Sequence, residues 1–281
     1  NFKDTRSILA RLSSNYYKNK PKNIVAVTGT NGKTSISDFF CQIFKLQNIK
    51  SGFIGTLGFR KNKLLKKRNL TTLDSLTLNK DLNEMSRSNI NNVIIEASSH
   101  GLKQKRLNFL KIKAGIFTNL SHDHLDYHKN MRDYLQSKLL LFNDLLNKGE
   151  TIITDSEIKQ FKEIKKIQAK RNLKLLTLGP NGNTFKILSH KIFENYQFLE
   201  ARYKNKTYKL KINLYGTVQI KNLFMAILAA KVCGLKIEKI FNKIHKIESV
   251  DGRLHLIKTL PNKSKIFLDY AHTPEAMERA I

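Results

Sequence analysis

Apolar and polar positions follow periods that change from one segment of the chain to the next. Residues 2 to 17 place Ile8, Leu9, Leu12 and Tyr16 on one face, which predicts an amphipathic helix. The segment Asn19-Lys20-Pro21 then breaks the pattern, which indicates a linker into a new unit.

Strands and helices alternate after this linker. The fully apolar run at 24–27 predicts a buried strand, 29–34 a turn, and 35–46 a helix with apolar side chains at Ile36, Phe39, Phe40 and Ile43. Further strands are predicted at 93–95, 115–117, 151–153 and 173–178, with helices at about 131–146 and 156–169. This order favours an α/β fold with a doubly wound, mostly parallel sheet, whose ligands bind at the carboxyl ends of the strands.

The pattern changes between about residues 184 and 214, where apolar and polar residues alternate one by one. We expect a small antiparallel β insertion there, with a turn at Lys204-Asn205-Lys206. Helices at 218–232 and 236–246 follow, and then a strand at 266–268 and a helix that opens at Pro274.

Composition narrows the class of protein. No apolar run approaches the roughly 20 residues that span a bilayer, which favours a soluble protein without a membrane partner. Cys41 and Cys233 stand alone, so we expect no metal cluster or disulfide framework, and a reducing, cytoplasmic location. The net charge of +29 comes from scattered lysines, which favours a solvated surface over anion steering and leaves no expected nucleic-acid partner.

The turn Gly29-Thr30-Asn31-Gly32-Lys33-Thr34 has the context of a phosphate-binding loop, between a buried strand and a helix. The helix N-terminus offers free N–H groups to phosphates, Lys33 can neutralise the β and γ phosphates, and the Thr34 hydroxyl suits Mg²⁺. The alternative is a structural turn that happens to contain these residues.

Three other side chains are candidates for chemistry, each with an ordinary structural alternative. Glu96 ends an apolar strand, where a carboxylate needs a partner or a cation, but it could instead cap the following turn. His124 could bind a metal or serve as a hydrogen-bonded structural residue. Lys138 lies in a helix with apolar neighbours, and most helix lysines are simply solvated.

Four strings of residues resemble the Mur ligase family, and they occur in the family's order over nearly the whole chain. They are TGTNGKT at 28–34, EASSHGL at 96–102, FTNLSHDHLDYH at 117–128 and DYAHTP at 269–274. The second and third strings are most similar to the ligases that act on UDP-N-acetylmuramoyl-L-alanyl-D-glutamate.

The resemblance implies a role for each matching position. The ATP-binding set is Gly29, Thr30, Asn31, Gly32, Lys33, Thr34, Asn222, Arg253 and Asp269. The set that contacts the UDP-muramoyl-dipeptide is Thr71, Thr72, Ser98, Gln104 and Arg106. The set that holds metal ions is Thr34, Glu96, His124 and Lys138, with Lys138 carbamylated by CO2, and the catalytic set is Lys33, His124 and Lys138.

The resemblance also implies an organisation and an activity. Residues 1–20 would connect from an N-terminal UDP-binding domain, 21–250 would form the central ATP-binding domain, and 251–281 would begin a Rossmann-like C-terminal domain. With ATP and Mg²⁺, a monomeric ligase would join a diamino acid, meso-diaminopimelate or L-lysine, to the D-Glu carboxylate through an acyl phosphate. The chain in isolation would bind ATP without turnover.

Two other classes of function stay open from the residues. One is another ligase of the same superfamily, such as folylpolyglutamate synthetase, which shares the loop and the lysine. The other is a non-catalytic module that binds nucleotides or, as the charge permits, nucleic acid.

Overall fold

The structure is a computed structural model that describes residues 4–61, 64–66, 69–123, 126–273 and 276–278. The strands are β1 (Asn23–Thr28), β2 (Ser51–Gly55), β3 (Gly58–Lys61), β4 (Leu64–Lys66), β5 (Asn92–Glu96), β6 (Ile112–Phe117), β7 (Leu146–Asp155), β8 (Lys174–Gly179), β9 (Phe185–Ile192), β10 (Gln197–Tyr203), β11 (Lys206–Ile212), β12 (His255–Thr259) and β13 (Lys265–Leu268). The α-helices are α1 (Thr5–Tyr16), α2 (Lys33–Leu46), α3 (Ser75–Arg87), α4 (Ser99–Lys103), α5 (Met131–Leu140), α6 (Phe161–Arg171), α7 (Thr217–Val232) and α8 (Ile237–Phe241).

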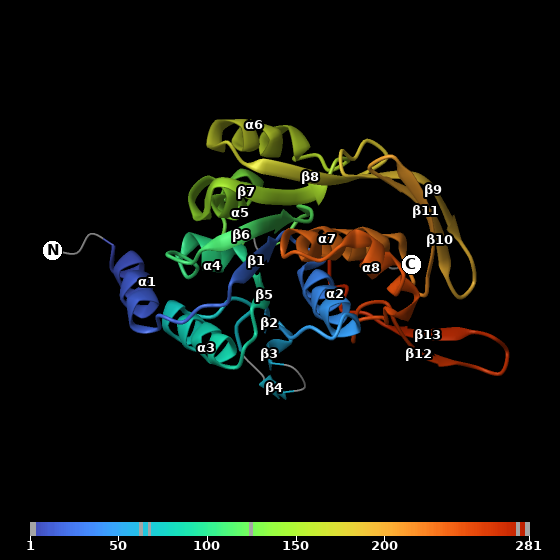
Figure 1. Cartoon of the computed structure of the whole chain (residues 1–281), viewed down its shortest axis with the longest axis horizontal. Helices are drawn as coiled ribbons and strands as arrows, with labels where there is room; N and C mark the ends of the chain where they lie inside the picture. Colours follow the sequence, from blue (N-terminus) through green and yellow to red (C-terminus); the bar gives the residue numbers. More distant parts are fainter. Residues whose placement is uncertain (1–3, 62–63, 67–68, 124–125, 274–275, 279–281) are drawn as a thin grey trace.

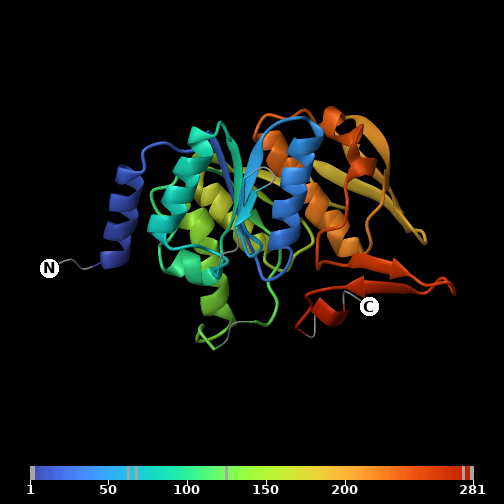
Figure 2. The ribbon, with the colours of Figure 1, turned by 90° about the horizontal axis from the view of Figure 1, so that it is seen from below.

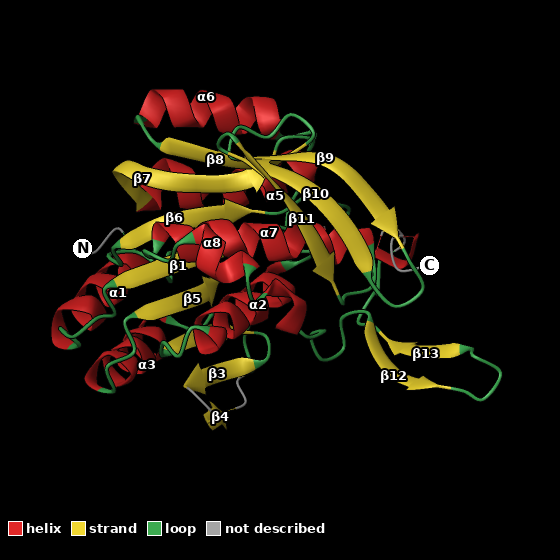
Figure 3. Cartoon of the chain, turned by 45° about the vertical axis from the view of Figure 1, so that its right-hand side comes forward, coloured by secondary structure: helices red, strands yellow, loops and turns green. Residues whose placement is uncertain are grey.

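Strands β1 to β11 form one sheet, in the order β11-β10-β9-β8-β7-β6-β1-β5-β2-β3-β4. The seven strands from β9 to β2 in that order run parallel, and an antiparallel pair continues the sheet at each edge. Figure 3 shows β9, β10 and β11 bending away from the rest. The predicted mostly parallel α/β sheet is confirmed, and the antiparallel strands at 185–212 extend it by pairing β9 with β8.

Strand β1 is buried on both faces, and its side chains divide between two cores. Val25 and Val27 pack with α2, α7 and α8, whereas Ile24 and Ala26 pack with the helices on the other face, among them α3, α5 and α6. Such continuous apolar strands are typical of parallel sheets that are covered on both sides. Figure 2 shows the sheet standing between these helix layers.

Helix boundaries differ from the predictions where packing or turn chemistry overrides periodicity. The helix predicted over 131–146 ends as an α-helix at Leu140, and a π-helical turn (Leu141–Leu145) leads into β7. Phe142 in that turn is fully buried against Gly115 of β6. The helix predicted from 156 begins only at Phe161, because the Asp155 carboxylate accepts the Glu157 N–H (2.9 Å) and forms a turn.

Both ends of the described chain carry small units outside the main sheet. Helix α1 packs on α3, and β12 and β13 pair as a separate antiparallel hairpin (Figure 1). The helix predicted at 236–246 is α8 followed by a 3-10 turn (Ile244–Lys246). Pro274, the predicted start of the last helix, lies outside the described residues. Among the residues described, none of the helices has the length and apolar character to cross a membrane.

Candidate active site

The carboxyl ends of three neighbouring parallel strands meet at one edge of the sheet. In the register of β1, Val27 lies opposite Glu96 of β5 and Thr28 lies opposite Phe117 of β6. Strands β5 and β2 lie on one side of β1, and β6 and β7 lie on its other side, so the strand order reverses at β1. Doubly wound sheets bind ligands at such a switch point, outside the carboxyl ends of the strands.

The loop after β1 keeps its backbone close to two neighbouring segments. Gly29 has a φ of +140°, and a Cβ there would lie 1.8 Å from the Thr118 hydroxyl oxygen. Gly32 has a φ of +93° at the N-terminus of α2, and a Cβ there would lie 2.6 Å from Oδ1 of Asn222. Both positions therefore require glycine, and the loop can present the free N–H groups of α2 to an anion.

The segment after β6 holds this loop in place. The Thr30 N–H donates to the carbonyl oxygen of Asn119 (3.0 Å), and the Asn31 N–H donates to the Asn119 side-chain oxygen (3.0 Å). The hydroxyl of Thr118 donates to the Asn31 carbonyl (2.6 Å). The predicted phosphate loop is thus a fixed turn, with its backbone donors and acceptors tied to β6.

Two lysine side chains converge on one carbonyl of the loop. The Gly29 carbonyl oxygen accepts from Nζ of Lys33 and from Nζ of Lys138, at 2.9 Å each, and Lys33 also donates to the Thr30 carbonyl (2.7 Å). Lys138 is only 1% exposed, and its Nζ lies 4.2 Å from the centre of the Tyr134 ring. Burial, with a smaller contribution from the charge of Lys33, holds the pKa of Lys138 well below its ordinary value.

Glu96 is fully buried beside this loop and is bound by three donors. Its carboxylate accepts from the Thr56 N–H (3.1 Å), the Thr56 hydroxyl (2.9 Å) and the Thr34 hydroxyl (3.4 Å). Burial raises the pKa of Glu96, and the charge of Lys33 partly opposes that shift. Thr56 was not predicted from the sequence, because its role depends on a short hairpin turn between β2 and β3.

The oxygen atoms of Thr34 and Glu96 suit a magnesium ion. Mg²⁺ in phosphate sites takes one or two carboxylates, hydroxyl groups or waters, and phosphate oxygens. Thr34 and Glu96 offer such oxygens next to the loop. The described part of the chain contains no group of three or more His, Cys, Asp and Glu side chains placed to hold a metal, and His124, the fourth predicted ligand, lies outside it.

A pocket surrounds the phosphate loop and brings together residues from distant parts of the chain. Its lining includes most of the predicted ATP-binding set and Thr71 from the predicted dipeptide set. Asp269 fixes one wall, because its carboxylate accepts the N–H groups of Leu254 (2.6 Å) and Ala271 (2.7 Å). The side chains that the sequence did not predict include Thr56, Asp123, Gln219, Tyr270 and His272.

Arg253 enters the same pocket from the segment between α8 and β12. Its guanidinium lies 4.7 Å from the centre of the Tyr270 ring. Burial lowers the pKa of Arg253 although Glu96 and Asp269 oppose the shift, so the cation is partly desolvated and lies near two carboxylates. Tyr270 follows Asp269 in a string that was noted from the sequence, which is the signal that could have identified it.

The other predicted dipeptide residues form a second group beside α4. The Thr72 hydroxyl donates to the Glu96 carbonyl (2.7 Å) and accepts from the Ser98 N–H (2.8 Å). Nη2 of Arg106 donates to the Gln104 side-chain oxygen (2.6 Å). These four residues are not among those that line the loop pocket. Thr72 connects them to the pocket, because its hydroxyl donates to the carbonyl of Glu96 at the end of β5.

Known proteins with a similar sequence or structure are ligases. The chain is 36% identical over 282 residues to the UDP-N-acetylmuramoyl-L-alanyl-D-glutamate--2,6-diaminopimelate ligase of Rickettsia bellii, and the match covers 99% of the chain and 58% of that protein. A solved structure of a ligase with the same name has a TM-score of 0.81 at 29% identity, over 95% of this chain and 54% of that one.

A third similar protein shares only the fold. Folylpolyglutamate synthetase from Lactobacillus casei has a TM-score of 0.73 at 13% identity, over 99% of this chain and 75% of that one. The match to the Rickettsia bellii ligase covers 58% of that protein, so this chain spans a little over half of its length. Residues 27–230 match the family model of the Mur ligase middle domain, and the chain belongs to the Mur ligase family.

Proposed function

We propose that this chain is part of an ATP-dependent amide ligase of peptidoglycan precursor synthesis. The enzyme would join a diamino acid to the D-Glu carboxylate of UDP-MurNAc-L-Ala-D-Glu through an acyl phosphate. The observation that carries the proposal is the buried amine of Lys138 on the Gly29 carbonyl, inside a phosphate-loop site of a Mur ligase.

Lys138 has the environment that carbamylation by CO2 needs. The reaction requires a neutral amine, and burial lowers the pKa of Lys138 in that direction. The resulting carbamate would place an anion next to the Lys33 ammonium, and the two charges would attract each other. We propose that this group orients a metal ion, together with His124.

The other residues would act on the two reacting groups. Lys33 and the N–H groups of the loop would stabilise charge on the transferring phosphoryl group, where preorganised donors contribute most to the rate. Thr34 and Glu96 would hold Mg²⁺, which supplies charge neutralisation at the phosphates when bound. Asn222, Arg253 and Asp269 would contact the adenine, ribose or phosphates of ATP.

The peptide substrate would lie beside α4. Thr71, Thr72, Ser98 and Gln104 offer hydroxyl and amide groups, and Arg106 offers a guanidinium for carboxylate or phosphate oxygens. Thr71 lines the loop pocket and its hydroxyl lies 3.1 Å from that of Thr56, so the two substrates would meet near Glu96.

The names of the relatives favour 2,6-diaminopimelate over L-lysine as the amine donor. We propose that residues 1–20 connect from a UDP-binding domain and that 251–281 begin a C-terminal domain, within a protein longer than this chain, as the Rickettsia bellii relative is. We also infer a cytoplasmic monomer without nucleic-acid or membrane partners. The rival activity of folylpolyglutamate synthetase is not favoured, because that similarity extends to the fold alone.

The test uses the protein extended to its full reading frame. Phosphate release from Mg-ATP and UDP-MurNAc-L-Ala-D-Glu is measured with diaminopimelate, with L-lysine and without an amine. We expect release that depends on diaminopimelate and disappears in Lys33→Ala. ATP binding without amine-dependent release in the full protein would contradict the proposal.

A further inference from the structure

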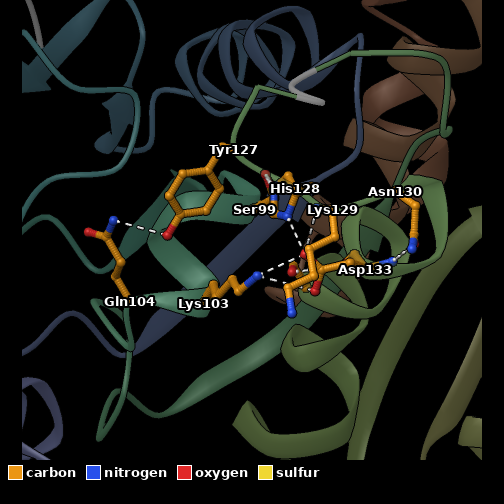
Figure 4. Close-up of polar contacts among 9 residues, drawn as sticks. Ser99, Lys103, Gln104, Tyr127, His128, Lys129, Asn130 and Asp133 are labelled. Carbon is orange, nitrogen blue, oxygen red and sulfur yellow. Dashed lines mark hydrogen bonds and ion pairs between the residues drawn. The ribbon is translucent and has the colours of Figure 1, made fainter.

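His128 is a buried side chain that the proposed reaction does not use, and it lies between α4 and the start of α5 (Figure 4). Its ring is 1% exposed. Nε2 lies 2.9 Å from the Ser99 hydroxyl oxygen, and Nδ1 lies 3.3 Å from the Asp133 carboxylate. Both ring nitrogens therefore have a partner, one on each helix.

The partners determine which nitrogen carries the proton. Burial, despite the opposing effect of Asp133, lowers the pKa of His128, so the ring is neutral at pH 7. The pKa of Asp133 is also lowered, chiefly by its hydrogen bond from Lys103, so its carboxylate accepts. Nδ1–H thus donates to Asp133, and Nε2 accepts the hydroxyl proton of Ser99.

The same three side-chain types form the nucleophilic triad of hydrolases, but this arrangement cannot work as one. Ser99 is 1% exposed and does not line the pocket around the phosphate loop. A substrate carbonyl could not reach its oxygen. The cluster is therefore a connection between elements.

Asp133 extends the connection along both helices. Its carboxylate accepts from Nζ of Lys103 at the end of α4 (2.8 Å) and from the Lys129 N–H (3.3 Å). The Asp133 N–H donates to the side chain of Asn130, which caps α5 (3.0 Å). Figure 4 shows Lys103, His128 and Lys129 converging on the Asp133 carboxylate.

The His128 ring also contacts a side chain that reaches the phosphate loop. The ring centres of His128 and Tyr134 are 5.0 Å apart, and the Tyr134 hydroxyl lies 3.2 Å from that of Thr30 in the loop. The Thr30 hydroxyl also accepts from the Ser121 N–H (3.0 Å). Tyr134 in turn lies under Nζ of Lys138. A continuous path of contacts therefore runs from Ser99, through His128 and Tyr134, to the loop.

We propose that His128 is a positioning residue that holds the segment around α4 in register with the phosphate loop. The inference rests on the proposed function, in which residues 98–106 bind the peptide substrate and the loop binds ATP. The two reacting groups come from these two segments, so a small shift between them would change the distance over which the phosphoryl group moves. Misplacement by about 1 Å can cost on the order of 10²-fold in rate.

The test compares His128→Phe with His190→Phe in the full-length protein. Phenylalanine keeps an aromatic ring at this position but has no ring nitrogen, so both hydrogen bonds of His128 are lost. His190 on β9 also has a side-chain partner, Oε1 of Gln197 at 2.7 Å, but lies outside the path and serves as the matched control. We expect kcat to fall on the order of 10²-fold in His128→Phe while KM for ATP changes less than about twofold, and both to stay within about twofold in His190→Phe.

Ser99→Ala provides the second variant, because it removes one bond and leaves the His128 ring in place. We expect a smaller fall in kcat, and the double variant Ser99→Ala/His128→Phe should be no slower than His128→Phe alone, since both residues act through one connection. Additive losses of kcat in the double variant would overturn the proposal. So would a loss of kcat that follows a fall in Tm and is equally large in His190→Phe.

Hydrogen exchange tests the connection without depending on ligase activity. In His128→Phe we expect faster exchange at the Gly101 N–H, which donates to the Ser98 hydroxyl. We also expect faster exchange at the Thr30 N–H and the Ser121 N–H in and beside the loop. Faster exchange confined to α4 would overturn the proposal. If the wild-type protein shows no amine-dependent phosphate release, the proposed function fails, and the exchange pattern still decides whether His128 joins the two segments.

Discussion

The Gly29 carbonyl illustrates how the site combines two costly groups at the residue scale. Two lysine amines bind this one oxygen, and one of them, Lys138, is almost completely buried. Two adjacent cations, one of them buried, are unfavourable, so the arrangement favours a neutral amine at Lys138. The position of Lys138 in an apolar helix was predicted, but its burial and its contact with the loop depend on residues 109 positions apart and could come only from the structure.

Replacement of Lys138 by Met should separate stability from function. In the folded chain the pKa of Lys138 is lowered, so between the folded value and about 10.4 the unfolded chain binds more protons and stability rises with pH. Lys138→Met should therefore raise the free energy of unfolding at pH 7 by about 1 kcal/mol or more, and weaken its pH dependence. Ligase activity should fall at least about 10²-fold.

The measurement is urea unfolding of the full protein at pH 7 and pH 9 in CO2-depleted buffer. Lys162→Met, which changes an exposed lysine on α6, is the control and should alter stability by less than about 0.5 kcal/mol. A Lys138→Met protein that is less stable than wild type at pH 7 would show that the buried amine contributes net stability.

Glu96 should give the stabilisation by Mg-nucleotide a pH dependence. Its pKa is raised by burial, so its carboxylate becomes protonated at a pH above the ordinary value of about 4.3. A protonated carboxyl no longer holds Mg²⁺, so the increase in Tm caused by Mg²⁺ with a non-hydrolysable ATP analogue should shrink as the pH falls from 7 to 5.

Glu96→Gln should lose most of this increase at every pH in the same thermal unfolding experiment. Asp155→Asn is the matched control, because Asp155 is also a buried carboxylate at a strand end but binds Lys221 (2.6 Å) instead of facing the loop. An equal loss in both variants would show that the effect is general and would exclude Glu96 as the magnesium ligand.

At the scale of elements, the sequence predicts what depends on local pattern. The strand, turn and helix around the phosphate loop lie where periodicity indicates, and α2 begins two residues early because Gly32 caps it. The first hairpin (β2–β4) and strand β12 were missed, because each of these strands has only three to five residues, whereas β13 lies where a strand was predicted at 266–268. Thr56, which binds Glu96, was missed with the first hairpin.

Helix α7 illustrates an element whose place is decided by packing. Most of its residues are buried, and Phe224 contacts the rings of Phe185 on β9 (5.1 Å between centres) and Phe241 on α8 (6.2 Å). Phe224→Ala should therefore lower the free energy of unfolding by about 3–5 kcal/mol, since it leaves a cavity between three elements.

Chemical denaturation of the full protein checks this value. Leu188→Ala on β9 is the control, because that side chain is 39% exposed and its loss should cost less than about 1 kcal/mol. If the two variants differ by less than about 1 kcal/mol, the packing of Phe224 between β9 and α8 does not contribute the expected stability.

At the scale of the whole molecule, the fold and the net charge should affect different steps of the proposed reaction. The fold places the loop pocket at the switch point of the sheet, and this placement follows from strand order alone. The net charge of +29 adds nothing to the fold. Its scattered lysines favour a solvated surface, but the small anionic substrates of the proposed ligase would still benefit from the positive field. Charge should therefore affect the encounter with substrates and leave the chemical step unchanged.

Ionic strength tests this separation. Raising NaCl from about 20 mM to 300 mM shortens the Debye length from roughly 20 Å to 6 Å. We expect kcat/KM for UDP-MurNAc-L-Ala-D-Glu to fall several-fold while kcat stays within about twofold, because screening weakens long-range steering but not the short contacts of Lys33 and Glu96. An equal fall in kcat and kcat/KM would place the salt-sensitive charges inside the site. Independence of kcat/KM from salt would instead identify the scattered lysines as a solvated surface without a part in capture.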